Sequence, residues 1–172
     1  MALARKEQIR KETKHKIQML RELEGRCRTS RGSLWFLAYL EEVFRYFRKI
    51  RKCSRKKRSD IRSVLNSSRL KKLTKVKRRS LFRRILDATT KSPHSTRSRW
   101  TLGLKYINAK RKVMEKVGFA EFVTTHGGIS GCERLWRELQ SKKTKQKIKQ
   151  ARAGASSVSR NIDDDDDEDK DW

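Results

Sequence analysis

Lysine and arginine side chains are concentrated in the second quarter of the chain, where they could bind phosphate groups. Residues 45–84 contain 19 Lys and Arg and a single acid, Asp60, which gives a formal charge of +18. Cationic side chains neutralise phosphates and release condensed counterions, and arginine adds bidentate contacts to the phosphate oxygens. We call residues 45–84 the basic belt. It predicts binding to the backbone of a nucleic acid rather than a solvated face without a ligand.

Two stretches of the basic belt carry most of its cations, and two arginines near residue 135 join them. The candidate nucleic-acid-binding residues are Arg48, Lys49, Arg51, Lys52, Arg55, Lys56, Lys57, Arg58, Lys71, Lys72, Lys75, Lys77, Arg78, Arg79, Arg83, Arg84, Arg134 and Arg137. Because residues 51–79 combine high charge with few apolar residues, we expect part of them to be disordered and to order on contact with the ligand.

Residues 119–139 have the outline of a helix, a glycine turn and a second helix. Gly127-Gly128 breaks the first helix, and Ser130 with Glu133 has the S-x-x-E spacing of a capping box, which predicts a new helix start. In a helix-turn-helix, the first residues of the second helix face the bases. Those residues would be Ser130, Glu133, Arg134 and Arg137. A packed helical hairpin predicts the same pattern and is the favoured interpretation.

Patterns that carry catalysis or metal binding are missing from the sequence. The three cysteines and three histidines include no C-x₂-C or H-x₃-H pair. The acids Asp60, Asp87, Glu115 and Glu121 each stand alone, and the GGISG turn lacks the Lys-Ser/Thr ending of a nucleotide-binding loop. We therefore expect a protein that is not an enzyme and that has no catalytic residues, no metal and no cofactor.

Helices are the elements expected to position the basic residues. The chain has 172 residues, with one proline and eight glycines, which argues against a turn-rich β protein. With 34% hydrophobic residues and a net charge of +27, it can bury one modest core. We predict an all-α fold: a small helical domain with long basic helices and a disordered acidic C-terminal tail.

The expected organisation has three parts. Residues 1–32 hold an amphipathic helix, 33–150 a helical basic core, and 151–172 a flexible linker and the tail. Apolar spacing predicts helices over 3–24, 33–50, 80–88 and from about residue 96 to 117. The aromatic residues of 33–50 are expected in the core. The alternative is an exposed edge that stacks on a ligand or forms a dimer, made of Trp35, Tyr39 and Tyr46.

The C-terminal end is strongly acidic. Residues 163–171 contain eight acids and one lysine, a net charge of −7. A flexible linker over 151–162 would span about 20 Å, so the tail could reach the basic belt of the same molecule. The tail could then mimic nucleic acid and displace loosely bound ligand. A purely solubilising role, or docking to a protein partner, is the alternative.

Three segments resemble parts of known proteins. The ending from Asp163 to Trp172 resembles the acidic, aromatic-terminated tails of bacterial and phage single-strand-binding proteins, which dock partner proteins or their own DNA groove. Trp172 stands where those tails have Phe, and no five-strand OB pattern precedes it, so the resemblance implies a tail mechanism alone. The segments SRW (98–100) and FVTTHGGISGCERLW (122–136) resemble small basic proteins of unknown function from bacterial plasmids and mobile elements, which assigns no activity.

Together these features predict an intracellular accessory or regulatory protein that binds nucleic acid, with DNA favoured over RNA. The longest apolar run, residues 34–40, is far shorter than the ~20 residues that span a bilayer, so no membrane partner is expected. We expect it in the cytoplasm on the nucleoid, or in a eukaryotic nucleus, where 51–58 would act as an import signal. The alternatives are an RNA-binding or ribosome-associated protein and a helical protein-interaction module that could form a homodimer.

Overall fold

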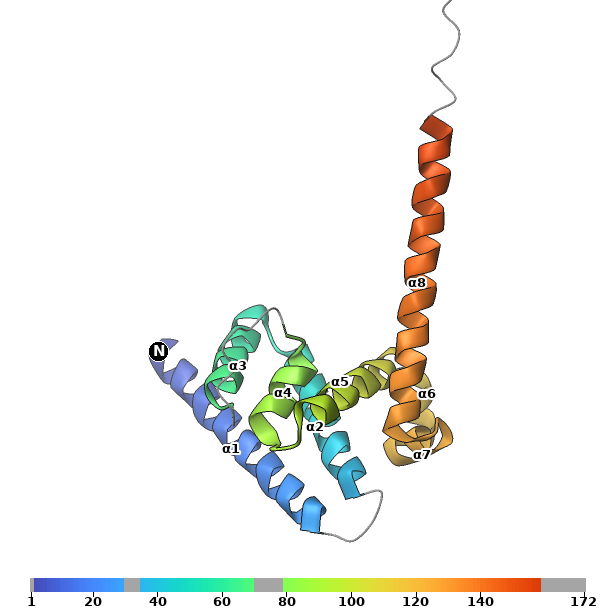
Figure 1. Cartoon of the computed structure of the whole chain (residues 1–172). Helices are drawn as coiled ribbons and strands as arrows, with labels where there is room; N and C mark the ends of the chain where they lie inside the picture. The colour runs from blue at the N-terminus through green and yellow to red at the C-terminus, as the bar shows by residue number, and fades with distance from the viewer. Residues whose placement is uncertain (1, 30–34, 70–78, 159–172) are drawn as a thin grey trace, which may run out of the picture. The chain divides into compact units, whose positions relative to one another are not determined.

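The computed structural model describes residues 2–29, 35–69 and 79–158, and within these ranges it contains eight α-helices and no strand (Figure 1). The prediction of an all-α fold is confirmed. The acidic tail lies outside the described residues. The helices are α1 (Ala2–Thr29), α2 (Trp35–Lys52), α3 (Arg55–Ser67), α4 (Leu81–Thr89), α5 (His94–Ala109), α6 (Arg111–Val117), α7 (Phe119–Thr125) and α8 (Gly128–Val158).

The chain divides into two units, Met1–Trp136 and Arg137–Trp172. The first unit contains the core and all of the helices up to the start of α8. In the second unit the described part is the C-terminal portion of α8, which continues as helix to Val158. Residues 151–158, where the sequence suggested a linker, are therefore helical.

Helix α1 lies against α2, α3 and α4 through a narrow stripe at helical spacing. Ile9, Ile17 and Leu20 in this stripe are buried. The helix predicted over 3–24 is longer in the structure, because α1 continues through Gly25 to Thr29. Glu24 is buried, forms an ion pair with Arg28 one turn later, and accepts a hydrogen bond from Thr90 at 2.8 Å. These contacts support the last turn, and a helical glycine opposes them by only about 1 kcal/mol.

The aromatic residues of α2 form the centre of the core, as the sequence predicted. Phe47 stacks on Phe82 of α4 with ring centroids 3.7 Å apart, and Phe44 lies 5.8 Å from Phe119. Tyr39 is fully buried, and its hydroxyl lies 2.6 Å from Thr89 Oγ1. Tyr46 is also buried, so these two tyrosines do not form an exposed edge. The side chain of Trp35 lies outside what the structure describes.

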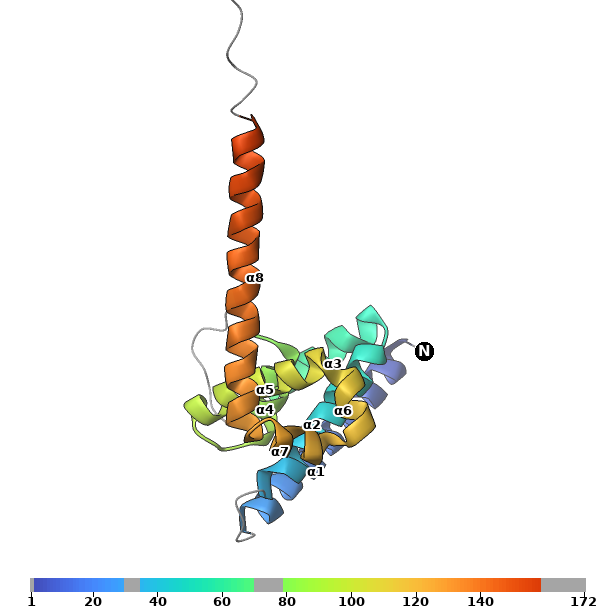
Figure 2. The same ribbon diagram turned by 90° about the vertical axis from the view of Figure 1, so that its right-hand side faces the viewer.

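Helices α5 and α6 replace the single helix that the sequence predicted between about residues 96 and 117. The chain turns at Lys110, whose backbone N–H still donates to the Tyr106 carbonyl. The turn lets Met114 of α6 become buried, and α7 then lies beside α2 and α6 (Figure 2). The α5–α6 corner therefore brings residues 108–111 close to the end of α2, where the basic belt begins.

The glycine turn before α8 is explained by close packing. The expected capping box is wrong, because α8 begins at Gly128 and Ser130 already lies inside the helix. A Cβ atom on Gly131 would lie only 1.9 Å from the His126 carbonyl oxygen, so no larger residue fits there. On α5, a Cβ on Gly103 would lie 2.5 Å from Ile129 Cδ1. Both glycines allow backbones to approach closely.

Candidate nucleic-acid interface

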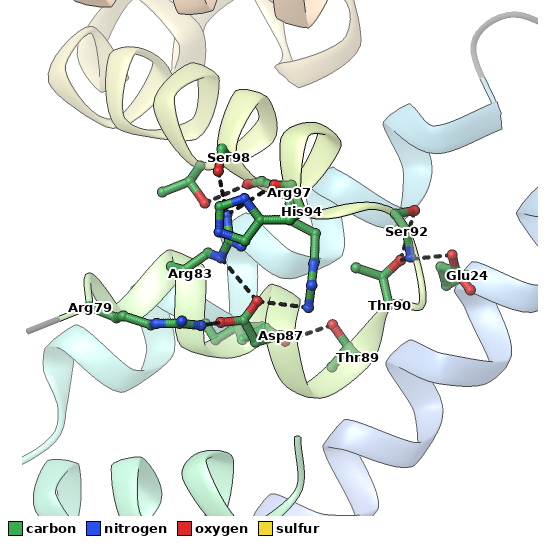
Figure 3. Close-up of polar contacts among 12 residues, drawn as sticks. Glu24, Arg79, Arg83, Asp87, Thr89, Thr90, Ser92, His94, Arg97 and Ser98 are labelled. Atoms are coloured by element: carbon green, nitrogen blue, oxygen red, sulfur yellow. Dashed lines mark hydrogen bonds and ion pairs between the residues drawn. The ribbon is translucent and has the colours of Figure 1, made fainter. Parts of the chain in front are cut away.

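Two of the predicted phosphate-binding arginines, Arg79 and Arg83, are instead held by a buried carboxylate, Asp87 (Figure 3). Asp87 is 1% exposed. Its Oδ1 lies 2.9 Å from Arg83 Nε and 2.8 Å from Arg97 Nη1, and its Oδ2 lies 2.5 Å from Arg79 Nη1. We call these four residues the Asp87 cluster. It joins α4 to the start of α5.

Arg83 is a structural residue, because its guanidinium points into the molecule. It is 7% exposed, and its Nη1 donates to Ser98 Oγ at 2.7 Å. Burial lowers the pKa of Arg83, although the nearby Asp87 raises it. The Nη2 atom of Arg83 and the Nε atom of Arg97 are buried and have no hydrogen-bond partner. The Asp87 cluster thus carries more positive charge than its one carboxylate neutralises.

The first stretch of the basic belt meets the α5–α6 corner in a polar hollow of about 440 Å³. We call it the α2–α6 hollow. Its lining residues are Phe47, Arg48, Arg51, Lys52, Asn108 and Arg111. Arg48 Nη1 pairs with Glu115 Oε1 at 2.5 Å, and both side chains remain partly exposed. Among the described residues, no acid pairs with Arg51, Lys52 or Arg111, and all three are exposed.

The cations of α3 continue this surface. Ser54 caps the helix by accepting a hydrogen bond from the Lys57 backbone N–H, which fixes where the run of 55–58 begins. Lys57 Nζ lies 3.7 Å from Glu12 Oε2, so this side chain is already paired. Arg55, Lys56 and the preceding Lys49 are exposed, whereas Arg58 is half-buried.

Five predicted residues lie outside the described part of the chain. They are Lys71, Lys72, Lys75, Lys77 and Arg78. Arg84, adjacent to the buried Arg83, is half-buried and extends toward α3, where its Nη1 donates to Asn66 Oδ1. Folding therefore divides the described residues of the basic belt into those that face solvent and those that are buried or half-buried.

The helix-turn-helix candidate is built from α7 and the beginning of α8. Ile129 and Cys132 are buried, and burial raises the pKa of the Cys132 thiol to about 11. Glu133 Oε2 lies 3.4 Å from Nε of the exposed Arg99 of α5, so this acid is already paired with a cation of the same chain. The remaining predicted residues of α8, Ser130, Arg134 and Arg137, are exposed. This arrangement accounts for a packed hairpin, and base reading stays a prediction.

Further cations lie on α8, beyond those selected from the sequence. They are Lys142, Lys143, Lys145, Lys147 and Lys149, and all are exposed. The Lys-rich run was visible in the sequence. Arg111 and Asn108, in contrast, line the α2–α6 hollow only because the chain turns at Lys110. No local sequence pattern predicts that turn.

The described residues contain no group of three or more His, Cys, Asp and Glu side chains able to hold a metal ion. Within the same residues, no helix has both the length and the apolarity needed to cross a membrane. Comparisons of the chain with protein-family models, with curated proteins and with solved structures return no match.

Proposed function

We propose that the protein binds nucleic acid, with DNA favoured over RNA, by gripping backbone phosphates in the α2–α6 hollow. The observation that carries this proposal is the convergence of Arg51, Lys52 and Arg111 on one hollow without an acidic partner among the described residues. Arg111 lies far from Arg51 and Lys52 in the sequence. These three cations therefore come together only in the folded chain. We infer an accessory or regulatory role without catalysis, on the nucleoid or in a nucleus.

Two features of this hollow suit it to the phosphates of a nucleic acid. Arginine and lysine side chains at fixed separations can neutralise successive phosphates, and each neutralised phosphate releases counterions. Asn108 adds a neutral amide that can donate to a phosphate oxygen without adding charge. Exposed Arg55 and Lys56 at the start of α3 extend the cationic surface beyond the hollow. Such contacts position the ligand and carry no sequence information of their own.

The interaction-module alternative gains no support from the aromatic helix. Tyr39, Phe44 and Phe47 are buried against α4, α5 and α7 of the same chain, which leaves them unable to form a dimer face. The RNA alternative depends on the same phosphate contacts, and direct competition between matched DNA and RNA duplexes decides it.

The test is a salt series of fluorescence anisotropy titrations on a labelled DNA duplex. For the double variant Arg51→Gln/Arg111→Gln we expect the slope of log K against log salt to become shallower by about 2, since each lost phosphate contact removes about 0.9. The matched control is Arg10→Gln/Lys14→Gln, which removes the same charge from exposed positions of α1. Equal slopes for the two double variants would mean that net charge, and not the hollow, determines binding.

Deleting residues 163–172 tests the tail hypothesis in the same assay. If the tail competes with nucleic acid, the truncated chain binds more tightly at low salt, and the difference shrinks as salt screens the tail. An affinity that truncation leaves unchanged at low salt contradicts the competition.

A further inference from the structure

Three arginines meet on a second surface, between α3 and α4, that the nucleic-acid proposal does not use. Arg69 Nη2 and Arg84 Nη1 both donate to the same atom, Asn66 Oδ1, at 2.7 Å and 2.5 Å. Arg62 lies one helical turn before Asn66, on the same face of α3. We call Arg62, Asn66, Arg69 and Arg84 the α3–α4 arginine group. The guanidinium groups of Arg69 and Arg84 therefore share one neutral acceptor oxygen.

No carboxylate neutralises this group among the residues that the structure describes. The nearest acid along α4 is Asp87, and it is already shared by Arg79, Arg83 and Arg97. Arg84 is tied to the edge of that cluster, since its Nε donates to the Arg79 carbonyl at 3.2 Å. Asp87 therefore contacts three arginines of its own cluster, and its ion pairs do not include Arg62, Arg69 or Arg84.

Two observations indicate that the α3–α4 arginine group lacks an anionic partner. The Nε atom of Arg69 is buried and has no hydrogen-bond partner. The pKa of Arg84 is lowered, first by burial and then by the charges of Arg69, Arg62 and Arg79. Like charges held together in this way repel one another, and a bound anion would convert the repulsion into attraction.

We propose that the α3–α4 arginine group is an oxyanion site that binds a phosphoryl group. A tetrahedral phosphate offers several charged oxygens to guanidinium forks, and such charge-assisted hydrogen bonds are about twice as strong as neutral ones. The phosphate oxygen would take over the role that the neutral Asn66 Oδ1 fills in the free protein. Asn66 would then turn its amide N–H₂ toward the ligand as an additional donor.

Two sources could supply the phosphoryl group: free phosphate or the backbone of a nucleic acid. Both present the same oxygens to the arginines. The site is separate from the α2–α6 hollow, so it can be tested with inorganic phosphate alone, and its failure would leave the nucleic-acid proposal standing.

The experiment measures the melting temperature of the full chain by circular dichroism in inorganic phosphate at about 10 mM. This value is compared with the melting temperature in chloride at the same ionic strength. A ligand at roughly ten times its dissociation constant should raise the melting temperature by about 4 °C. For Arg69→Gln/Arg84→Gln we expect this rise to be lost. In chloride alone, this variant should melt no lower than the wild type, because it removes repulsion.

The matched control is Arg10→Gln/Lys14→Gln, which removes the same charge from exposed positions of α1, outside both this group and the basic belt. It should keep the full response to phosphate. Isothermal titration of the wild type and both variants with inorganic phosphate, and then with an unphosphorylated oligonucleotide, separates the two sources. Binding of either one that depends on Arg69 and Arg84 supports the site. The proposal is overturned if the wild type binds neither phosphate nor the oligonucleotide, if Arg69→Gln/Arg84→Gln binds both as tightly as the wild type does, or if the two variants lose binding equally.

Discussion

Replacing Asp87 with Asn tests whether one carboxylate holds α4 and α5 together. The change keeps the shape of the side chain and removes its charge, which leaves three guanidinium groups facing a neutral amide. Their side chains are only 17%, 8% and 4% exposed for Arg79, Arg83 and Arg97, so water cannot replace the lost partner. Breaking a buried pair by removing one partner costs about 3–5 kcal/mol.

That loss is large beside the ~5–15 kcal/mol that stabilises a typical domain. Urea unfolding followed by circular dichroism, with the free energy extrapolated to water, measures it. The control is Glu115→Gln, which breaks the pair with Arg48, whose side chains are 34% and 43% exposed. A surface pair of this kind contributes about 1 kcal/mol or less. An Asp87→Asn loss no larger than the Glu115→Gln loss would refute the structural role of the cluster.

Three other predictions concern the fold itself. Gly131→Ala should destabilise the protein by about 1–3 kcal/mol or more, because the new Cβ would lie 1.9 Å from the His126 carbonyl oxygen. Gly25→Ala should stabilise it by about 0.5–1 kcal/mol, because a Cβ there meets no atom within 4 Å, and urea unfolding of both variants should show opposite signs. Burial raises the pKa of Cys132 from 9.0 to about 11 and that of Tyr46 from 10.0 to about 12, so the unfolded chain ionises first. The stability that these neutral groups contribute is fully present below pH 9 and is lost as the pH rises toward 12. The measurement is the free energy of unfolding as a function of pH. If the Cys132→Ala/Tyr46→Phe variant has the same pH dependence of this free energy as the wild type, the prediction is contradicted.

The sequence predicted the elements whose signals are local. Ser80 stands before the apolar pattern of α4, and its side chain does accept a hydrogen bond from the Arg83 N–H as an N-cap. The 2–3 apolar residues per turn of α2 likewise predicted a buried aromatic face, and Tyr39 and Phe44 occupy it. In both cases the information lies within a few residues of one helix.

The candidate site was harder to predict, because its residues meet through tertiary packing. Arg83 and Arg84 are neighbours of identical type, yet one contacts Asp87 inside the molecule and the other contacts Asn66 on α3. The spacing of Arg83 and Asp87 could have indicated an ion pair along one helix. The contribution of Arg97 could not be foreseen, because it depends on how α5 lies against α4.

The α5–α6 corner has a consequence for how the basic stretch behaves when it is removed from the protein. A synthetic peptide covering residues 45–58 would retain its dense positive charge, but it would lack Asn108 and Arg111, which complete the hollow. Grafted onto an unrelated carrier, such a peptide would confer salt-sensitive attraction to any polyanion. The peptide would lose the arrangement of its charges relative to Arg111, because that arrangement depends on the α5–α6 corner of the folded protein.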